Sequence, residues 1–460
     1  MILNSFFNKN FSPTSNQKVA LTQLDSFLKS NENVMILKGF AGTGKTTIVA
    51  ALVSFLEATK REYFLLAPTG KAAKVMSIYS HRFATTIHKK IYRQQNIPGT
   101  YNFVLGTNVS RGGVFIVDEA SMIGFGNEFN TNGLLYDLFE YLYNGESCQL
   151  IFVGDTAQLP PIGEIESPAL NPSAIKREFV ETCNLVELTE VVRQAKDSGI
   201  LVNATKIREL IENQEVGYPK FELNVPEIKL INGGELQECI EQAYYNFGEE
   251  NTVILTRSNK YANSYNQQIR NRIFDYDTEI TGGEKLMVVK NNYFFTKEYE
   301  KLGFIANGDT LEIKKVLHEV ELYGFKFMDV VARLKDYDAD PEIEIKIILE
   351  SLHSLGPALT KEQNNELIQN ITLDYPEEPS RRKKWQLIKE NPYFNAVQVK
   401  YAYAITGHKA QGGQWDCVFV DQSFFIEDML NIDYLRWLYT CFTRAKKQLY
   451  LVNFKPEFFS

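Results

Sequence analysis

The chain lacks paired cysteines and long apolar runs. Its five cysteines are scattered, and none forms a C-x-x-C pair. A disulfide framework and a cysteine zinc site therefore lack support, and buried free thiols are the simpler interpretation. No apolar run approaches the ~20 residues that span a bilayer, and the first residues lack the basic start and cleavage site of a signal peptide. We therefore expect a cytoplasmic protein.

The chain also lacks an excess of basic residues. Lys and Arg number 49 against 57 Asp and Glu, a net charge of -8. This balance argues against a general nucleic-acid coat protein, which would be basic, but it leaves room for a locally basic cleft that grips one strand. The 460 residues are enough for two or three domains, each with its own core.

Apolar segments alternate with helical patterns at the start of the chain. The predicted strands are "NVMILKGF", "EYFLLAPT", "GVFIVDEAS" and "CQLIFVGD", and a helical pattern follows the first two of them. Such alternation predicts an α/β fold with a parallel sheet covered on both faces. Ligands of such sheets bind at the carboxyl ends of the strands, where this chain places its polar motifs.

The same pattern resumes later and is interrupted once. We predict one α/β domain over 1–186 and a second over 187–460, with strands in "NTVILTRSN" and two more within 398–421. Between 309 and 395 the segments "DTLEIKKV", "FKFMDVVARL" and "EIEIKIILE" predict an all-β insertion, followed by a charged helix containing "RRKKW". A smaller piece, 91–113, interrupts the first domain and is compatible with a hairpin.

A phosphate-binding loop follows the first predicted strand. The segment "GFAGTGKTT" matches G-x-x-x-x-G-K-[ST] between a strand and a helix, which is the context that the motif requires. Its backbone N–H groups and the helix N-terminus favour phosphates, Lys45 reaches the β- and γ-phosphates, and Thr46 can hold Mg²⁺. The motif predicts a nucleoside triphosphate site made by Gly42, Thr43, Gly44, Lys45, Thr46 and Thr47.

Two further strand ends carry groups suited to hydrolysis. Asp118 and Glu119 follow a hydrophobic strand, where the first would hold the magnesium shell and the second would orient or deprotonate water. Gln158, in "FVGDTAQLPPIG", lies where its amide could contact the γ-phosphate. A water-activating glutamate favours hydrolysis over phosphoryl transfer to another substrate.

Eight short segments occur in the order of the superfamily 1 helicase motifs. They are "GFAGTGKTT", "APTGKAAK", "TIHK", "VDEASM", "GDTAQLPP", "LTEVVRQ", "TGHKAQG" and "LYTCFTRAKK". The set resembles the 5′-to-3′ branch that contains RecD, the Pif-type helicases and Dda, and the length and late insertion are most similar to Dda. This resemblance implies two RecA-like domains, a strand-splitting hairpin at 91–113 and a Src-homology-type barrel at 309–395.

The resemblance implies further contacts with ATP. Gln17 matches the glutamine that recognises adenine, although a lone glutamine before a helix is common. Arg193 and Arg444 match the arginines that reach the γ-phosphate from the second domain, and ordinary salt bridges are the alternative for each. Gln411 and Gly412 of "TGHKAQG" would also face the nucleotide.

The resemblance likewise implies a set of strand contacts. Hydroxyls, amides and cations at these positions suit backbone phosphates, although both histidines could instead be core residues. The residues are Thr69, Lys71, Thr86, His88, Thr406, His408 and Lys409. Phe103 is the candidate wedge side chain of the hairpin, with Tyr101 as a close competitor, and "RRKKW" could touch nucleic acid or form a solvated basic face.

These observations predict a monomeric helicase that depends on ATP and Mg²⁺, moves 5′ to 3′ on single-stranded DNA and opens forked duplex DNA. Replication, repair and recombination are the expected pathways, and proteins of those pathways are the expected partners. An RNA or RNA–DNA hybrid translocase on the same fold is the alternative, and a non-translocating nucleotide switch is a more distant one. One departure concerns Gln414, which stands where many relatives carry a ribose-binding glutamate, so the sugar preference stays open.

Overall fold

The computed structural model describes residues 3–6, 12–97, 100–126, 133–180, 182–192, 198–296, 304–335, 340–422 and 424–459, with the side chains of 94–97 and 100–103 left out. Across these ranges no helix has both the length and the apolar character needed to cross a membrane.

The first domain is built on a six-stranded parallel sheet of order β3-β2-β6-β7-β1-β8. Its strands are β1 (Val34–Gly39), β2 (Tyr63–Ala67), β3 (Ala84–Thr86), β6 (Val114–Val117), β7 (Gln149–Gly154) and β8 (Asn184–Leu188). One face packs on α1 (Ser15–Lys29), α2 (Lys45–Ala58) and α3 (Gly70–Ser80), and the other on α4 (Ile87–Ile91), α5 (Leu134–Tyr143) and α6 (Pro172–Glu178). Burial on both faces explains why the central strands are near-continuous apolar runs.

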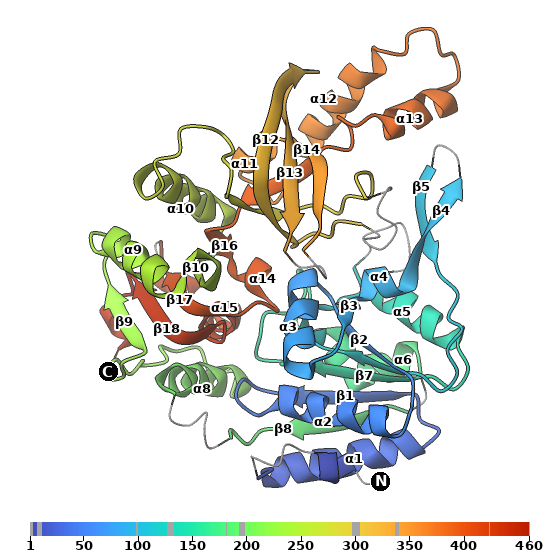
Figure 1. Ribbon diagram of the computed structural model, residues 1–460. Helices are drawn as coiled ribbons and strands as arrows, with labels where there is room; N and C mark the ends of the chain where they lie inside the picture. The colour runs from blue at the N-terminus through green and yellow to red at the C-terminus, as the bar shows by residue number, and fades with distance from the viewer. Residues whose placement is uncertain are drawn as a thin grey trace.

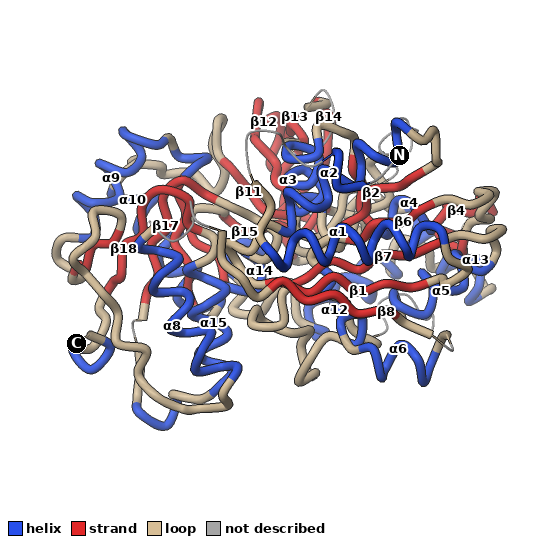
Figure 2. The backbone as a smooth tube through the Cα atoms, turned by 90° about the horizontal axis from the view of Figure 1, so that it is seen from below, coloured by secondary structure: helices blue, strands red, loops and turns tan. Residues whose placement is uncertain are grey.

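A second parallel sheet of order β16-β10-β17-β18-β9 lies beside the first (Figures 1 and 2). Its strands are β9 (Ile228–Ile231), β10 (Thr252–Thr256), β16 (Ala404–Thr406), β17 (Trp415–Asp421) and β18 (Ala445–Val452). The helices α9 (Leu236–Phe247) and α10 (Asn259–Arg272) cover one face, and α8 (Gly199–Glu212) and α15 (Ile432–Phe442) cover the other; the short α14 (Gly407–Ala410) follows β16. The α/β class with two parallel sheets is confirmed.

A closed five-stranded barrel is inserted into the second domain. It consists of β11 (Lys285–Val288), β12 (Thr310–Leu322), β13 (Phe325–Leu334), β14 (Glu342–Ile348) and β15 (Val397–Tyr401). The barrel is wider than the predicted insertion, and β15, which we expected in the second sheet, instead closes the barrel by pairing with β11 and β14. An apolar run fits either sheet, so only these distant pairings decide its place.

Helices α11 (Glu350–His353), α12 (Lys361–Thr372) and α13 (Arg381–Glu390) follow β14, and α12 and α13 project beyond the barrel (Figure 1). The "RRKKW" segment is the start of α13, as predicted.

The hairpin predicted within 91–113 is present. It consists of β4 (Tyr92–Ile97) and β5 (Thr100–Leu105), which pair antiparallel. The backbone of Phe103 pairs with that of Gln94, but the side chain of the candidate wedge lies outside the description. The predicted boundary at 186 falls inside β8, the edge strand of the first sheet.

Candidate functional site

The phosphate loop joins β1 to α2 in the geometry that the motif requires. Gly42 and Gly44 have φ of 76° and 85°, a region open to glycine without strain. The ammonium of Lys45 donates to the carbonyls of Gly39 at 2.6 Å and Phe40 at 3.0 Å, and lies 3.9 Å from the Asp155 carboxylate. The Lys45 ammonium is thus held by backbone carbonyls at the start of the loop, close to the Asp155 carboxylate.

The predicted acidic pair follows β6, close to this lysine. Asp118 accepts hydrogen bonds from the Tyr79 hydroxyl at 2.6 Å and from the Glu119 N–H at 2.8 Å. Glu119 has φ of 52°, a costly conformation for a non-glycine residue that points to a functional constraint. Burial raises the pKa of the Glu119 carboxyl, Arg444 opposes that rise, and Asp118 adds to it.

Arg444 of the second domain faces the first domain at this point. Its guanidinium lies 3.6 Å from the Glu119 carboxylate, and the arginine is only 4% exposed. It donates to the carbonyls of Thr440 at 3.1 Å and Gly413 at 3.3 Å, which fix its direction. An arginine that is predicted to reach the γ-phosphate therefore meets the predicted water-orienting glutamate.

Gln411 and Gly412 also lie on this boundary. The amide of Gln411 donates to the Leu159 carbonyl of the first domain at 2.7 Å. Gly412 has φ of 72°, and a Cβ built on it would lie 2.6 Å from that of Ala72. The "TGHKAQG" segment thus packs directly against the first domain.

The two predicted nucleotide-sensing glutamines differ in their bonding. Gln17 is buried, accepts from the Thr14 N–H and donates to the Thr43 carbonyl, both at 3.0 Å, so its amide braces the phosphate loop. The Gln158 carbonyl oxygen is buried and has no hydrogen-bond partner within the described ranges. An unpaired buried acceptor is costly, which marks Gln158 as a residue awaiting a ligand or a water. Arg193 lies outside the described residues.

Sequence reasoning missed Tyr439, on α15 of the second domain. Its hydroxyl accepts from the Ala41 N–H of the phosphate loop and donates to the Asp155 carboxylate, both at 2.8 Å. The next residue, Thr440, accepts from the Leu159 N–H at 2.9 Å. Burial, reinforced by Asp155, holds the pKa of the Tyr439 phenol well above its usual range. Only its place in "LYTCFTRAKK" singled it out, and an aromatic in an apolar helix resembles a core residue.

Three predicted strand-contacting threonines begin helices at the carboxyl ends of strands. Thr69 accepts from the Ala72 N–H and Thr86 from the Lys89 N–H, each at 3.2 Å, so both side chains cap their helices. Thr406 starts α14 without a capping hydrogen bond from its side chain.

The histidines and the lysine that are predicted to contact the strand differ in their surroundings. His88 is 9% exposed, whereas His408 is exposed. The Lys71 ammonium lies 3.7 Å from the ring centroid of Trp415, across the domain boundary. A partly exposed cation–π pair of this kind contributes ~1 kcal/mol, so Lys71 links the two domains in this conformation.

Two family profiles match the chain. One, described as an AAA domain, matches residues 14–217, and the other, described as a UvrD-like helicase C-terminal domain, matches residues 401–452. The first match contains the phosphate loop and the acidic pair, and the second contains "TGHKAQG" and Arg444.

Among curated proteins, the RecBCD enzyme subunit RecD of Buchnera aphidicola is 23% identical over 99% of this chain and 75% of its own length. The ATP-dependent DNA helicase dda of Enterobacteria phage T4 is 26% identical over 62% of each chain. The chain spans only 25% of the length of one curated relative, the ATP-dependent RecD2 DNA helicase of Deinococcus radiodurans, and 98% of the length of another. A solved structure from a study of forked duplex unwinding by two Pif1 helicases covers 97% of this chain and 93% of that one, at 15% identity and a TM-score of 0.50, so the fold is shared.

Proposed function

We propose that the chain is an ATP-driven DNA helicase of superfamily 1, in the 5′-to-3′ branch with RecD, Dda and Pif1, to which its profiles and relatives are similar. It would move 5′ to 3′ along a single strand and open forked duplex DNA.

The observation that carries this proposal is the nucleotide site shared by the two domains. Lys45 and Glu119 come from the first domain, and Arg444 reaches to 3.6 Å from Glu119 out of the second. A nucleotide between them interacts differently with closed and open arrangements, which is the condition for converting hydrolysis into domain motion. Since one chain supplies both halves of the site, activity as a monomer is supported.

The residues present suit a magnesium ion. Thr46 supplies a hydroxyl in the first turn of α2, and Asp118 supplies a carboxylate after β6 that the Tyr79 hydroxyl hydrogen-bonds, so the carboxyl edge of the first sheet offers two oxygen donors. Mg²⁺ is usually held by one or two such groups together with nucleotide phosphates, so no larger protein cluster is required. When bound, the ion would neutralise charge on the phosphates.

The chain's own groups would prepare the water and hold the phosphates. Glu119, deprotonated above its raised pKa, would accept a hydrogen bond from the attacking water. Lys45 would leave the Gly39 and Phe40 carbonyls to meet the β- and γ-phosphates. Arg444, held by backbone carbonyls, would stabilise charge on the γ-phosphate without reorganising, an effect worth roughly 10³–10⁵ in rate in other nucleotide hydrolases.

Strand contacts would then alternate between the domains. Thr69 and Thr86 present helix starts from the first sheet, and Thr406 presents one from the second. The Lys71–Trp415 contact spans the two sets, so opening of the boundary would change their spacing.

The deciding experiment combines ATPase and unwinding assays on forked, 5′-tailed and 3′-tailed DNA. The wild-type chain is expected to open the forked and 5′-tailed substrates and to hydrolyse ATP faster with single-stranded DNA. Glu119→Gln is expected to abolish stimulated hydrolysis, whereas Glu140→Gln, an equal charge change on the exposed side of α5, is not.

Unwinding of only the 3′-tailed substrate would refute the direction. Normal turnover in the Glu119→Gln variant would refute the hydrolytic role of that residue. Stronger stimulation by a matched RNA oligonucleotide would favour the RNA translocase.

A further inference from the structure

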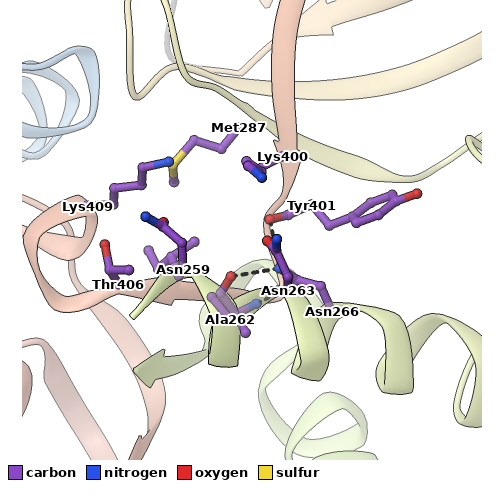
Figure 3. Close-up of a pocket in the computed structure, with 11 residues that line it drawn as sticks. Asn259, Ala262, Asn263, Asn266, Met287, Lys400, Tyr401, Thr406 and Lys409 are labelled. Carbon is purple, nitrogen blue, oxygen red and sulfur yellow. Dashed lines mark hydrogen bonds between the residues drawn. The ribbon is translucent and has the colours of Figure 1, made fainter. Parts of the chain in front are cut away.

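A small hollow lies where the barrel joins the second sheet. The first turn of α10, strand β15 and the start of α14 line it, and Figure 3 shows Asn259, Lys400 and Lys409 pointing into the same space. The enclosed part of the hollow is about 10 Å³, which is close to the space of one water. The rest is open to solvent, so a larger group would lie at the mouth of the hollow, against the side chains that line it.

Lys400 is an unusual lysine. It lies on β15, is 5% exposed, and its ammonium donates to the Ser354 carbonyl. No carboxylate within the described ranges pairs with it. Lys346 on the neighbouring β14 is similarly buried, but its ammonium donates to the Asp329 carboxylate at 2.6 Å. A buried charge without a counter-ion is costly, so an anion bound beside Lys400 would stabilise its charged form.

A second cation and a free amide face the same hollow. Lys409, from α14, has no ion pair within the described ranges, and burial lowers its pKa to about 8. The pKa of Lys400 is also lowered to about 8, by burial first and by Lys409 second. The side chain of Asn259 makes no hydrogen bond within the described ranges, and it opens α10, whose N-terminus favours anions.

We infer that this hollow binds one phosphate of the DNA strand between Lys400 and Lys409, with the Asn259 amide as a further donor. The inference rests on the proposed function. It adds a residue of the barrel, on β15, to the residues that contact the DNA strand. The hollow adjoins Thr406, a predicted strand contact, so the chain of phosphates would continue from α14 to the barrel. No carboxylate lines the hollow, which fits an anionic occupant.

The test measures single-stranded DNA affinity of the full chain against salt concentration, for wild type and Lys400→Met. Each phosphate contact in a single-strand complex adds about 0.7 to the slope of log K against log salt. The Lys400→Met variant is therefore expected to lose about 0.7 of slope and to bind about tenfold more weakly. Lys400→Arg keeps the charge and is expected to keep the slope.

The melting temperature of the same variant gives a second readout, and it is expected to stay the same or rise while DNA affinity falls. Replacing an uncompensated buried cation by an apolar chain of similar size relieves its desolvation, so Lys400→Met is expected to melt at an unchanged or higher temperature. The matched control is Lys346→Met, which removes a buried barrel lysine that has a carboxylate partner; it is expected to keep the wild-type slope.

An unchanged slope in Lys400→Met, or an equal loss in Lys346→Met, would overturn the inference while leaving the helicase proposal intact. Absence of salt-dependent binding in the wild-type chain would instead count against the proposed function itself.

Discussion

The two parallel sheets end their edge strands in the same pattern. In the first sheet, β3 ends at Thr86 and is followed by Ile-His-Lys; in the second, β16 ends at Thr406 and is followed by Gly-His-Lys. Each edge strand pairs parallel with a single neighbour, β2 or β10. Two similar turns therefore occupy comparable places in the two domains.

Their side chains are used differently. The Thr86 hydroxyl accepts the Lys89 N–H and His88 is 9% exposed, so this turn is committed to its own domain. The Thr406 side chain makes no capping bond, His408 is exposed, and Lys409 points into the hollow beside the barrel. The comparison indicates that the turn after β3 mainly stabilises the first domain, whereas the turn after β16, called here the binding edge, has side chains available to bind the DNA strand.

The nucleotide side shows a complementary difference. The first sheet has a glycine loop after β1, whereas β10 of the second sheet ends at Thr256 and continues as Arg-Ser-Asn. The second domain instead contributes Arg444 and Tyr439 across the boundary. Most groups of the nucleotide site thus follow strands of the first sheet, and the site is complete only when the second domain adds its side chains.

The largest expected effect contrasts two lysines. Lys45→Ala in the first domain is expected to reduce turnover by at least about 10²-fold at saturating DNA, because a preorganised charge on the phosphates is lost. Lys409→Ala in the second is expected to keep turnover at saturating DNA while raising the DNA concentration for half-maximal stimulation about tenfold. Steady-state ATPase titrations measure both, and equal effects of the two changes on turnover would contradict the division between the sheets.

Tyr439→Phe tests whether the second domain completes the nucleotide site. The change leaves the Asp155 carboxylate and the Ala41 N–H without their shared partner, and lost hydrogen bonds to charged groups correspond to about 10–100-fold in rate. We expect DNA-stimulated turnover to fall by that factor, with DNA affinity unchanged.

The control is Tyr434→Phe, at the start of the same helix α15. The Tyr434 hydroxyl accepts from the Gln422 amide inside the second domain at 2.9 Å. Turnover in the control is expected to stay near wild type. Equal losses of turnover in the two variants would show that the effect comes from general destabilisation of α15 and not from the contact with the nucleotide site.

A smaller effect separates the two threonines. Thr86→Val removes a helix cap and is expected to lower the free energy of unfolding by about 1 kcal/mol. Thr406→Val removes no capping bond, so its stability is expected to stay near wild type while DNA affinity falls several-fold. Denaturant unfolding and DNA titration of both variants measure this; a stability loss in Thr406→Val alone would reverse the assignment of support and binding edge.

Local spacing predicted what lies within one element or one turn. The phosphate loop and the acidic pair could be assigned because their residues are adjacent in the chain, and the α/β class followed from alternation. The meeting of Arg444 with Glu119 could be expected only through family resemblance, since 325 positions separate the two residues. Strand β15, Tyr439 and Lys400 escaped prediction because barrel closure and domain docking are long-range contacts with no local pattern.

The smallest expected effect is a pH dependence confined to the second domain's binding edge. Lys400 and Lys409, each with a pKa lowered to about 8, are charged below that pH and lose their charge above it. Phosphate binding requires the charged form, and each lysine is about half charged at pH 8, so DNA affinity is expected to fall a few-fold between pH 7 and 8. The nearby His408 is exposed at the surface but partly desolvated by its surroundings, which lowers its pKa, so it is already neutral there. Because arginine stays charged throughout, the double change Lys400→Arg and Lys409→Arg is expected to flatten the profile, and a fall that persists in this variant would place the titrating group outside the hollow.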